Sequence, residues 1–265
     1  MKQEILSYLT TECPWWDTLY WYDSVDSTNT RAKELAKAGA PHGTVIIAAT
    51  QTEGRGRMGR SFSSPCGMGV YLSVILRPDC KPEKLMHLTC AAGVAACKAI
   101  QQTSGICPDI KWANDLIWNR KKLGGILTEM SIGAAGTVDF AIIGIGINCC
   151  QKTADFPKLL QHMAISLQEA TGTVCSPARL TAALTESLYD MDHALFSKKD
   201  ELMAFYRHHC MTLGQEISLL KGDTIRHGTA LDIDADGGLL VRFSDGIVES
   251  VCSGEVSVRG MYGYL

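Results

Sequence analysis

Apolar residues in the first part of the chain fall into short runs, which predict strands buried within a sheet. Turn-forming and polar residues bound most of these runs, as is typical of strands rather than of long helices. The predicted strands cover Thr18–Tyr22, Thr44–Thr50, Gly69–Arg77, Ile110–Trp118, Leu123–Met130 and Val138–Ile147.

Helical periodicity marks segments between and after these strands. An alanine-rich stretch over Pro82–Ser104 places Leu85, Leu88 and several alanines along one helical stripe. Polar residues of Asp26–Asn29 form an N-cap cluster in front of a shorter helix over Arg31–Ala36. Two further helical segments are expected, Glu4–Leu9 and Pro177–Met211, the second with an interruption at Ser197–Asp200.

The pattern changes after Leu213, where short strands alternate with Gly/Asp turns and predict a small β-barrel. We therefore expect a main domain over residues 1–212 and a small domain over residues 213–265. The expected strands of the small domain are Glu216–Leu219, Gly228–Ile233, Gly238–Phe243, Ile247–Cys252 and Val256–Arg259.

Composition excludes several classes of protein. Hydrophobic residues make up 46% of the 265 residues and charged residues 20%, which supports a sizeable core rather than disorder. The net charge of −3 does not favour a nucleic-acid coat, and the small domain is acidic, so no DNA partner is expected. No apolar run reaches the roughly 18 residues of a membrane span. The N-terminus lacks a signal-peptide core, so we expect a cytoplasmic protein without membrane contact.

The eleven cysteines are numerous but contain no CxxC pair. Zinc ribbons and thioredoxin-like sites depend on that close spacing, so neither is indicated. Most of the cysteines are interpreted as reduced thiols packed in the core. No chemistry is assigned to them.

Three arginines and three glycines alternate in the segment Gly54–Arg60, called here the glycine–arginine loop. Its first six residues match the GxGxxG pattern, but a dinucleotide-binding loop leads into a helix, and here a strand is predicted next. Kinase-type loops share the pattern, but the HRD and DFG elements are missing. Glycines allow close backbone approach and guanidinium groups bind carboxylate or phosphate, so the loop is interpreted as an anion clamp that closes on its ligand.

A second apparent motif, the segment Asp232–Gly237, begins like an EF-hand calcium loop. The twelfth position, which needs a bidentate acid, is Phe243, and flanking helices are not predicted. The Asp-Gly pair is instead typical of a hairpin turn, so calcium is rejected.

Three polar segments interrupt or end the predicted strands: KWAND (111–115), KKLGGIL (121–127) and GIGIN (144–148). Each combines cationic or amide side chains with apolar or small residues that allow a ligand to approach a strand. Taken singly, each has an ordinary explanation, such as a solvated lysine turn.

In this order, the segments closely resemble the signature series of biotin protein ligase. The series is DSTN (26–29), QTEGRGRMGR (51–60), KWAND, KKLGGIL and GIGIN, followed by SGEVSVRG (253–260). The resemblance implies an α/β, mixed-sheet catalytic domain with a small C-terminal SH3-like β-barrel. Some relatives carry an N-terminal DNA-binding domain, and this chain resembles the monofunctional type without it.

The reaction implied by the resemblance has two steps. Biotin and ATP give biotinyl-5′-AMP and pyrophosphate, and a lysine of a biotin carboxyl carrier protein domain then takes the biotinyl group. Mg²⁺ is implied as the companion of ATP and is expected on phosphate oxygens, so no protein ligand is assigned to it. The carrier, the base for its lysine and the choice between monomer and homodimer remain open.

On the biotin side, the resemblance assigns the ureido ring to Ser27, Thr28 and Gln51, because a neutral polar ring needs neutral polar partners. Asn29 belongs to the same motif and either contacts biotin or braces the start of the helix. The wider biotin set adds Gly54, Arg55, Gly56, Arg57, Lys122, Gly125 and Gly144.

On the nucleotide side, Lys122 is expected to bridge biotin's carboxylate and the α-phosphate, with Arg57 as the second catalytic candidate. Fixed cations that bring two anions together supply most of such catalysis. The loop arginines are expected to close over the adenylate, with Arg60 at the phosphates. The whole ATP and adenylate set is Arg57, Arg60, Phe62, Lys111, Asn114, Asp115 and Asn148.

Two positions depart from the family pattern. Ala113 replaces a common proline, and Phe62 replaces a common tryptophan and either packs on the ligand or belongs to the core. Two alternative functions stay open, a lipoate ligase or octanoyltransferase-like enzyme and a non-catalytic biotin-binding protein. The complete glycine–arginine loop argues against the first, and Arg57 with Lys122 argues against the second.

Overall fold

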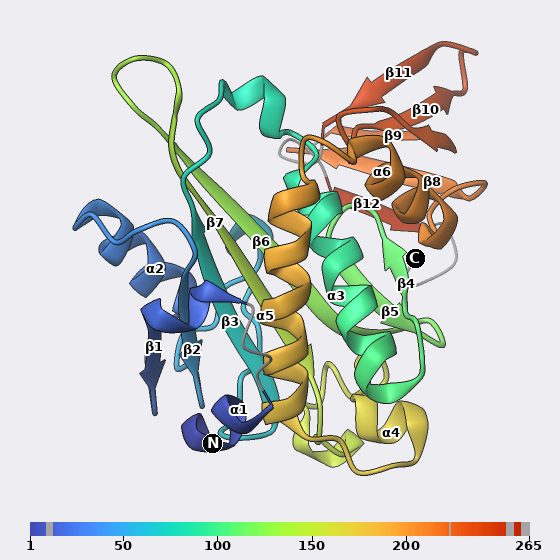
Figure 1. Cartoon of the computed structure of the whole chain (residues 1–265). Helices are drawn as coiled ribbons and strands as arrows, with labels where there is room; N and C mark the ends of the chain where they lie inside the picture. The colour runs from blue at the N-terminus through green and yellow to red at the C-terminus, as the bar shows by residue number, and fades with distance from the viewer. Residues whose placement is uncertain (9–12, 223, 253–256, 261–265) are drawn as a thin grey trace.

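The computed structural model describes residues 1–8, 13–222, 224–252 and 257–260. Its main unit is a seven-stranded sheet in the order β1-β2-β3-β7-β6-β5-β4, in which every neighbouring pair is antiparallel except β1 and β2 (Figure 1). The mixed sheet expected for the main domain is therefore present. Its strands are β1 (Leu19–Tyr22), β2 (Thr44–Ala48), β3 (Gly69–Leu76), β4 (Asp109–Lys111), β5 (Asp115–Trp118), β6 (Lys121–Ile132) and β7 (Val138–Asn148).

Helices cover both faces of this sheet. The described part of the chain has α1 (Lys2–Ser7), α2 (Thr28–Lys37), α3 (Leu88–Ser104), α4 (Leu167–Thr171), α5 (Pro177–Ala194) and α6 (Lys199–His209). Short 3₁₀ turns are η1 (Pro14–Thr18), η2 (Arg57–Gly59), η3 (Pro82–Leu85) and η4 (Thr153–Asp155). None of the described helices is long and apolar enough to cross a membrane.

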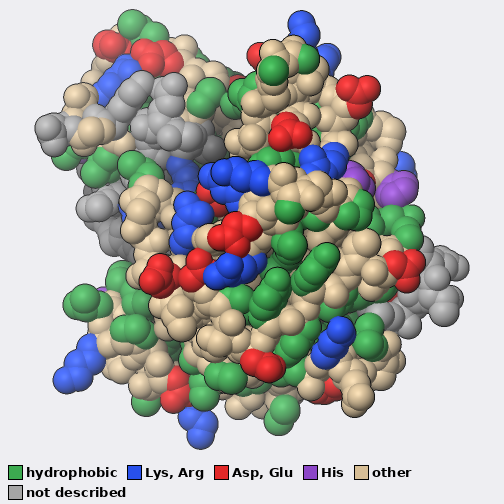
Figure 2. Space-filling view, turned by 90° about the vertical axis from the view of Figure 1, so that its left-hand side faces the viewer, with side chains coloured by type: hydrophobic (Ala, Val, Ile, Leu, Met, Phe, Trp, Pro, Cys, Tyr) green, Lys and Arg blue, Asp and Glu red, His purple; other side chains and the backbone are tan. Residues whose placement is uncertain are grey.

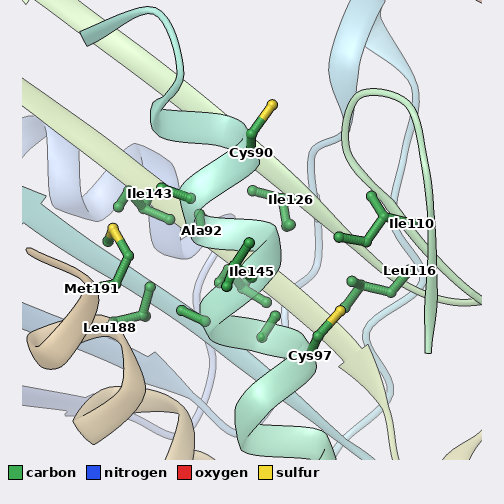
Figure 3. Packing of buried hydrophobic residues seen from close by; sticks show 14 of the residues in the cluster. Cys90, Ala92, Cys97, Ile110, Leu116, Ile126, Ile143, Ile145, Leu188 and Met191 are labelled. Atoms are coloured by element: carbon green, nitrogen blue, oxygen red, sulfur yellow. The ribbon is translucent and has the colours of Figure 1, made fainter. Parts of the chain in front are cut away.

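Alternation along the central strands divides the core into two layers. On β2, Val45 and Ile47 join the large cluster under α3 and α5, whereas Ile46 joins a small cluster under α2. Figure 3 shows the large cluster, in which α3 packs its small Ala92 near Ile143 of β7. Small side chains on α3 allow its backbone to approach the sheet closely. The central strands are continuous apolar runs because helices cover both of their faces.

The α2 face of β7 is only partly filled by apolar side chains. Phe140 and Ile142 lie in the cluster under α2, but the next residues on that face are Gly144, Gly146 and Asn148. Because two of these positions have no side chain, the sheet leaves room beside the N-terminal end of α2. The candidate site occupies that room.

The C-terminal strands form a second, five-stranded antiparallel sheet in the order β11-β10-β9-β8-β12. Its strands are β8 (Glu216–Lys221), β9 (Thr224–Ile233), β10 (Leu239–Phe243), β11 (Val248–Val251) and β12 (Ser257–Gly260). Residues 253–256 of the SGEVSVRG motif lie outside the described residues. The small antiparallel β-unit predicted after Leu213 is confirmed.

This second sheet is joined to the main unit by a continuous core. Ile217, Ala230 and Leu239 belong to the same buried cluster as α3 and α5. The indole of Trp112 donates to the carbonyl of Gly237 at 2.9 Å, which connects the KWAND segment to the β9–β10 turn. The KWAND segment therefore contacts both sheets.

Several predicted elements have different bounds in the structure. The helix predicted over Pro82–Ser104 is divided into η3 and α3, and the strand predicted over Ile110–Trp118 is divided into β4 and β5. The strand is interrupted because Asn114 turns the chain, its backbone N–H donating to Lys111 at 3.1 Å. The predicted interruption of the helical stretch after Pro177 is confirmed, since α6 starts at Lys199.

Candidate active site

One cavity of about 270 Å³ lies at the N-terminal end of α2, over β6 and β7. It brings together predicted site residues that are up to 121 positions apart in the sequence, from Ser27 to Asn148. Gly54 is the one predicted site residue that does not line it. The predicted residues that do are Ser27, Thr28, Asn29, Gln51, Arg55, Gly56, Arg57, Arg60, Phe62, Lys111, Asn114, Asp115, Lys122, Gly125, Gly144 and Asn148.

The glycines of GIGIN make room for two other side chains. A Cβ atom on Gly144 would collide with the side-chain amide of Asn29, and one on Gly146 would come within 2.5 Å of the Phe62 ring. The Asn29 amide and the Phe62 ring therefore lie directly against β7. The close approach predicted at this strand is therefore present, but its immediate occupants are the chain's own Asn29 and Phe62.

Neutral polar side chains form a connected network on one side of the cavity. The carbonyl oxygen of the Gln51 side chain accepts from the Thr28 backbone N–H at 2.8 Å and from the Thr28 hydroxyl at 3.1 Å. The Gln51 amide nitrogen donates to Ser64 at 2.8 Å. Ser73, which is fully buried on β3, lies 2.8 Å from the Thr28 hydroxyl and 2.7 Å from the Asn29 oxygen. These partners fix the orientation of Thr28 and Gln51 before any ligand binds.

Ser27 is placed differently from its neighbours. It is the N-cap residue of α2 and is only 2% exposed, yet its side chain does not make the usual capping hydrogen bond. A buried hydroxyl that lines a cavity and is not used to cap the helix is suited to a polar ligand.

The glycine–arginine loop folds back on itself as a tight hairpin. Gly56 N–H donates to the carbonyl of Arg60 at 2.7 Å, and Phe62 N–H donates to that of Gly54 at 2.7 Å. A Cβ atom on Gly54 would collide with the Phe62 carbonyl, so this glycine serves the turn rather than the cavity. The loop contains only the short turn η2 and then leads to β3, so the rejection of a dinucleotide-binding loop is confirmed.

The loop arginines have different partners. Arg55 makes a two-point contact with the carboxylate of Glu129 on β6, at 3.2 and 3.3 Å. Arg57 donates to the side-chain oxygen of Asn114 at 3.0 Å, and burial lowers the pKa of its guanidinium. Arg57 therefore carries a partly desolvated positive charge at the cavity, where an anion would be held more strongly than in water.

The KWAND segment is a tight connection between β4 and β5. Its Asn114 is tied to β6 from both ends, with its side-chain nitrogen donating to Ile126 and its carbonyl accepting from Ile126 N–H, each at 2.9 Å. Lys111 is 9% exposed at the end of β4. Asn114 thus anchors the segment and also contacts Arg57, so a ligand at Arg57 would meet a fixed neighbour.

Lys122 and Asp115 form an ion pair in the cavity wall. The Lys122 ammonium nitrogen lies 2.7 Å from a carboxylate oxygen of Asp115, and the two side chains are 30% and 15% exposed. They come from the paired strands β6 and β5, which sets their spacing. A Cβ atom on Gly125 would come within 3.3 Å of the Lys122 ammonium, so the glycine leaves the lysine room at the cavity.

Asn148 lines the cavity but is already engaged with the backbone around Lys122. Its side-chain nitrogen donates to the carbonyls of Lys122 and Ile165 at 3.4 and 3.2 Å, and its oxygen accepts from Gln151 at 3.4 Å. These contacts brace the backbone around Lys122, and the nucleotide contact expected for Asn148 stays a prediction.

The segment 156–164, for which the sequence predicts no element or role, forms an apolar wall of the cavity. Its backbone pairs with β6, because Lys122 N–H donates to Met163 at 2.7 Å and Ile165 N–H donates to Lys122 at 3.0 Å. No periodicity or charge pattern marks this irregular segment, so the sequence could not reveal it. The wall consists of Phe156, Leu160, Met163 and Ala164.

One group of charged side chains lies near the middle of the face shown in Figure 2, and further charged side chains are scattered around it. The Lys, Arg, Asp and Glu side chains of this group lie next to a band of hydrophobic side chains.

The described residues contain no group of three or more His, Cys, Asp or Glu side chains arranged to hold a metal ion. Asp234 of the EF-hand-like segment instead accepts the N–H groups of Asp236 and Gly238, at 2.9 and 2.8 Å, and so closes the β9–β10 turn.

Two family descriptions match the chain, one for each sheet. Residues 21–148 match the Biotin/lipoate A/B protein ligase family, and residues 212–259 match the Biotin protein ligase C terminal domain. The first match covers every predicted site residue, and the second covers most of the five-stranded sheet.

Named relatives agree with these descriptions. The Bifunctional ligase/repressor BirA of Bacillus subtilis is 38% identical over 234 residues, which are 86% of this chain and 70% of that protein. The Biotin--[acetyl-CoA-carboxylase] ligase of Mycobacterium tuberculosis is 30% identical over 80% of this chain and 79% of that protein.

Solved structures give the same result. The biotin protein ligase from Aquifex aeolicus, in complex with biotin and ATP, has a TM-score of 0.76 and 29% identity, and the match covers 92% of this chain and 99% of that one. The fold, the two family matches and the identity to a named relative over most of its length agree. The chain belongs to the biotin protein ligase family.

Proposed function

We propose that this chain is an ATP-dependent biotin protein ligase that makes biotinyl-5′-AMP and transfers the biotinyl group to a lysine of a biotin carboxyl carrier protein domain. The observation that carries the proposal is the composition of one cavity. A buried network of neutral groups lies beside Arg57 and Lys122, two cations from separate elements. A neutral polar ring with an anionic tail matches that division.

The neutral side receives the ureido ring of biotin. Ser27, Thr28 and Gln51 offer hydroxyl and amide groups to it, and the orientation of Thr28 and Gln51 is fixed by Ser73 and Ser64. Leaving a buried partner unpaired is costly, so such a site rejects acids that lack the ring. Asn29 supports this side from behind, since its amide is engaged with Glu129 at 2.9 Å and with the Leu127 carbonyl at 3.2 Å.

The charged side carries out the activation step. An oxygen of biotin's carboxylate attacks the α-phosphorus of ATP, a new C(O)–O–P bond forms, and pyrophosphate leaves with the electrons of the broken P–O bond. Lys122 bridges the carboxylate and the α-phosphate, and Arg57 holds the same region from the loop. Fixed cations reduce the repulsion between the two anions and position them for attack.

The remaining charged and aromatic residues bind the nucleotide. Arg60 contacts phosphate oxygens, Phe62 packs its ring on the adenylate, and Lys111 with Asn114 and Asp115 forms the far wall. Mg²⁺ fits this site as a companion of ATP held through phosphate oxygens, because Asp115 is the one carboxylate among the described lining residues. When bound, the ion would supply charge neutralisation at the phosphates.

In the second step the ε-amine of the acceptor lysine attacks the biotinyl carbonyl, an amide forms, and AMP leaves. Residues 1–212 form the catalytic domain and residues 213–265 the SH3-like domain in this proposal. The protein acts in the cytoplasm. The supporting observation for close cooperation of the two domains is the shared core and the bond from Trp112 to Gly237.

The test is the exchange of labelled pyrophosphate into ATP, measured with biotin, lipoate and octanoate in parallel. Exchange that depends on biotin is expected. Exchange with lipoate or octanoate but not with biotin would identify the acyl-ligase alternative, and binding of biotin without any exchange would identify a non-catalytic binding protein.

A further inference from the structure

Glu129 is a carboxylate beside the cavity that belongs to none of the expected site residues. It lies on β6, on the same face as Gly125 and Leu127, both of which line the cavity. Its side chain is 21% exposed. A half-buried carboxylate at the edge of a site for anionic ligands would weaken their binding unless its charge were matched.

The charge is matched by Arg55 of the glycine–arginine loop. The two guanidinium nitrogens lie 3.2 and 3.3 Å from the two carboxylate oxygens, which is the two-point geometry that planar guanidinium and carboxylate groups favour. One of the same oxygens accepts from Asn29 at 2.9 Å. A single side chain on a rigid strand thus contacts the start of α2 and the loop.

The two loop arginines hold different positions, and the difference separates their roles. Arg55 already holds a carboxylate in two-point contact, which an anionic ligand would have to displace. Arg57 donates to the neutral oxygen of Asn114, at 3.0 Å, and burial lowers the pKa of its guanidinium. Arg57 thus brings a partly desolvated charge to the cavity, whereas the charge of Arg55 is already matched by Glu129.

We propose that Glu129 is a positioning residue that latches the glycine–arginine loop over the cavity through Arg55, leaving Arg57 to hold the ligand. This inference rests on the proposed function for the identity of the ligand. The latch itself is a property of the ligand-free chain. Arg55, expected to contact biotin directly, acts on the loop instead.

The latch is tested first without any ligand, by hydrogen exchange of the loop amides of Gly56 and Arg60. Glu129→Gln removes the charge but keeps an amide oxygen for Asn29, and Arg55→Gln removes the other partner. Each variant should speed loop exchange about twofold to fivefold, the range for a partly exposed ion pair. The double variant should be no faster than either single variant, because both remove the same interaction. Unchanged exchange in the single variants would overturn the latch.

The second measurement is the rate at which biotinyl-5′-AMP leaves the enzyme, together with KM and kcat for biotin in the pyrophosphate exchange. Both single variants should raise adenylate release and KM by similar factors while kcat changes little. A much larger loss for Arg55→Gln than for Glu129→Gln, with effects that multiply in the double variant, would mean that Arg55 binds the ligand directly and would refute the proposal.

A matched control is available in the small sheet, where Arg226 and Glu249 form a similar two-point pair at 2.8 and 2.9 Å. Arg226→Gln should leave loop exchange and adenylate release unchanged. An equal response of this variant would show that the loop reports general destabilisation, which would also overturn the latch. If the unmodified chain shows no biotin-dependent exchange, the proposed function fails while the ligand-free measurement still decides the latch.

Discussion

The neutral and charged sides of the cavity differ in how their side chains are held before a ligand binds. On the neutral side, Thr28, Gln51 and Ser73 are tied to one another by hydrogen bonds, and Thr28 and Ser73 are fully or almost fully buried. On the charged side, Lys122 is held by Asp115 and remains 30% exposed. The neutral side is therefore arranged before the ligand arrives, whereas the charged side holds a cation in an internal pair whose partner the ligand must replace.

This difference has a consequence for mutations. A change on the neutral side alters how well the ring fits in both the ground state and the transition state, so it should act mainly on affinity. A change on the charged side removes stabilisation of charge that develops during reaction, so it should act mainly on rate. Three substitutions in the cavity test this division, and a fourth, outside the cavity, tests the pH dependence of stability.

The largest effect is expected for Lys122→Ala. Biotin-dependent pyrophosphate exchange should fall by about two to three orders of magnitude, the loss typical for one preorganised electrostatic group. Biotin itself should still bind, because the neutral network is untouched. Exchange rates and biotin affinity, measured by calorimetry, check this prediction, and near-normal exchange would contradict the role of Lys122.

A smaller effect is expected for Arg57→Gly, which removes the hydrogen bond to Asn114 and one cation of the proposed clamp. A hydrogen bond that involves a charged group contributes about 1.5–3 kcal/mol, so adenylate should escape roughly ten to a hundred times faster. Biotinylation of non-cognate proteins reports the escape. Retention equal to that of the unmodified chain would refute the clamp.

On the neutral side, Gly144→Ala forces a methyl group into the side-chain amide of Asn29. Overpacking of this kind costs about 1–3 kcal/mol. Here the cost should appear mainly as weaker biotin binding, with a smaller change in kcat. Gly133→Ala is the matched control, because the nearest atoms to its Cβ would be 3.7 Å away. If kcat fell while affinity held, the proposed division between the two sides would be wrong.

The smallest effect concerns pH and lies outside the cavity, whose described lining contains no histidine. Burial lowers the pKa of His87, whose Nε2–H donates to the Leu195 carbonyl oxygen at 2.9 Å, while its Nδ1 has no protein partner. Because the folded-state pKa is below the ordinary value of 6.5, the unfolded chain binds the proton more readily as pH falls through 6.5.

The free energy of unfolding should therefore decrease between pH 7 and pH 5, by up to about 1.4 kcal/mol per pH unit where the unfolded imidazole is protonated and the folded one is not. His87→Gln keeps a donor for Leu195 and should flatten this part of the profile in urea titrations. His209→Gln is the comparison, since the His209 pKa is also lowered by burial. A profile unchanged by His87→Gln would place the titrating group elsewhere.

Much of the fold was predictable because its central strands are continuous apolar runs and its small sheet is marked by Gly/Asp turns. The bounds of α3 were less so, since Pro82–Leu85 reads as the first turn of one long helix but forms η3. The strand around KWAND also reads as continuous. Its turn depends on Asn114 bonding to Ile126 of another strand, which no local pattern reveals.

The site was predictable in its membership but not in its internal partners. Motif residues from Ser27 to Asn148 do meet in one cavity, yet Asn148 is engaged with the backbone of Lys122 and Ile165, and Arg55 with Glu129. These pairings depend on the register of β6 against its neighbours. The apolar wall at Leu160 and Met163 has no sequence signal. The segment is irregular, so its role depends on where it packs in the folded chain and not on a local pattern.

The core that runs from α3 into the small sheet has a consequence for how the chain folds. Two segments that match separate families share one apolar interior, and Trp112 keeps its indole N–H satisfied through Gly237 on the other side of the boundary. Cutting the chain near residue 212 would expose Ile217's partners and leave a buried donor without an acceptor. Two evolutionary modules would thus melt as one cooperative unit, and neither could be exchanged for a foreign counterpart without repacking the other.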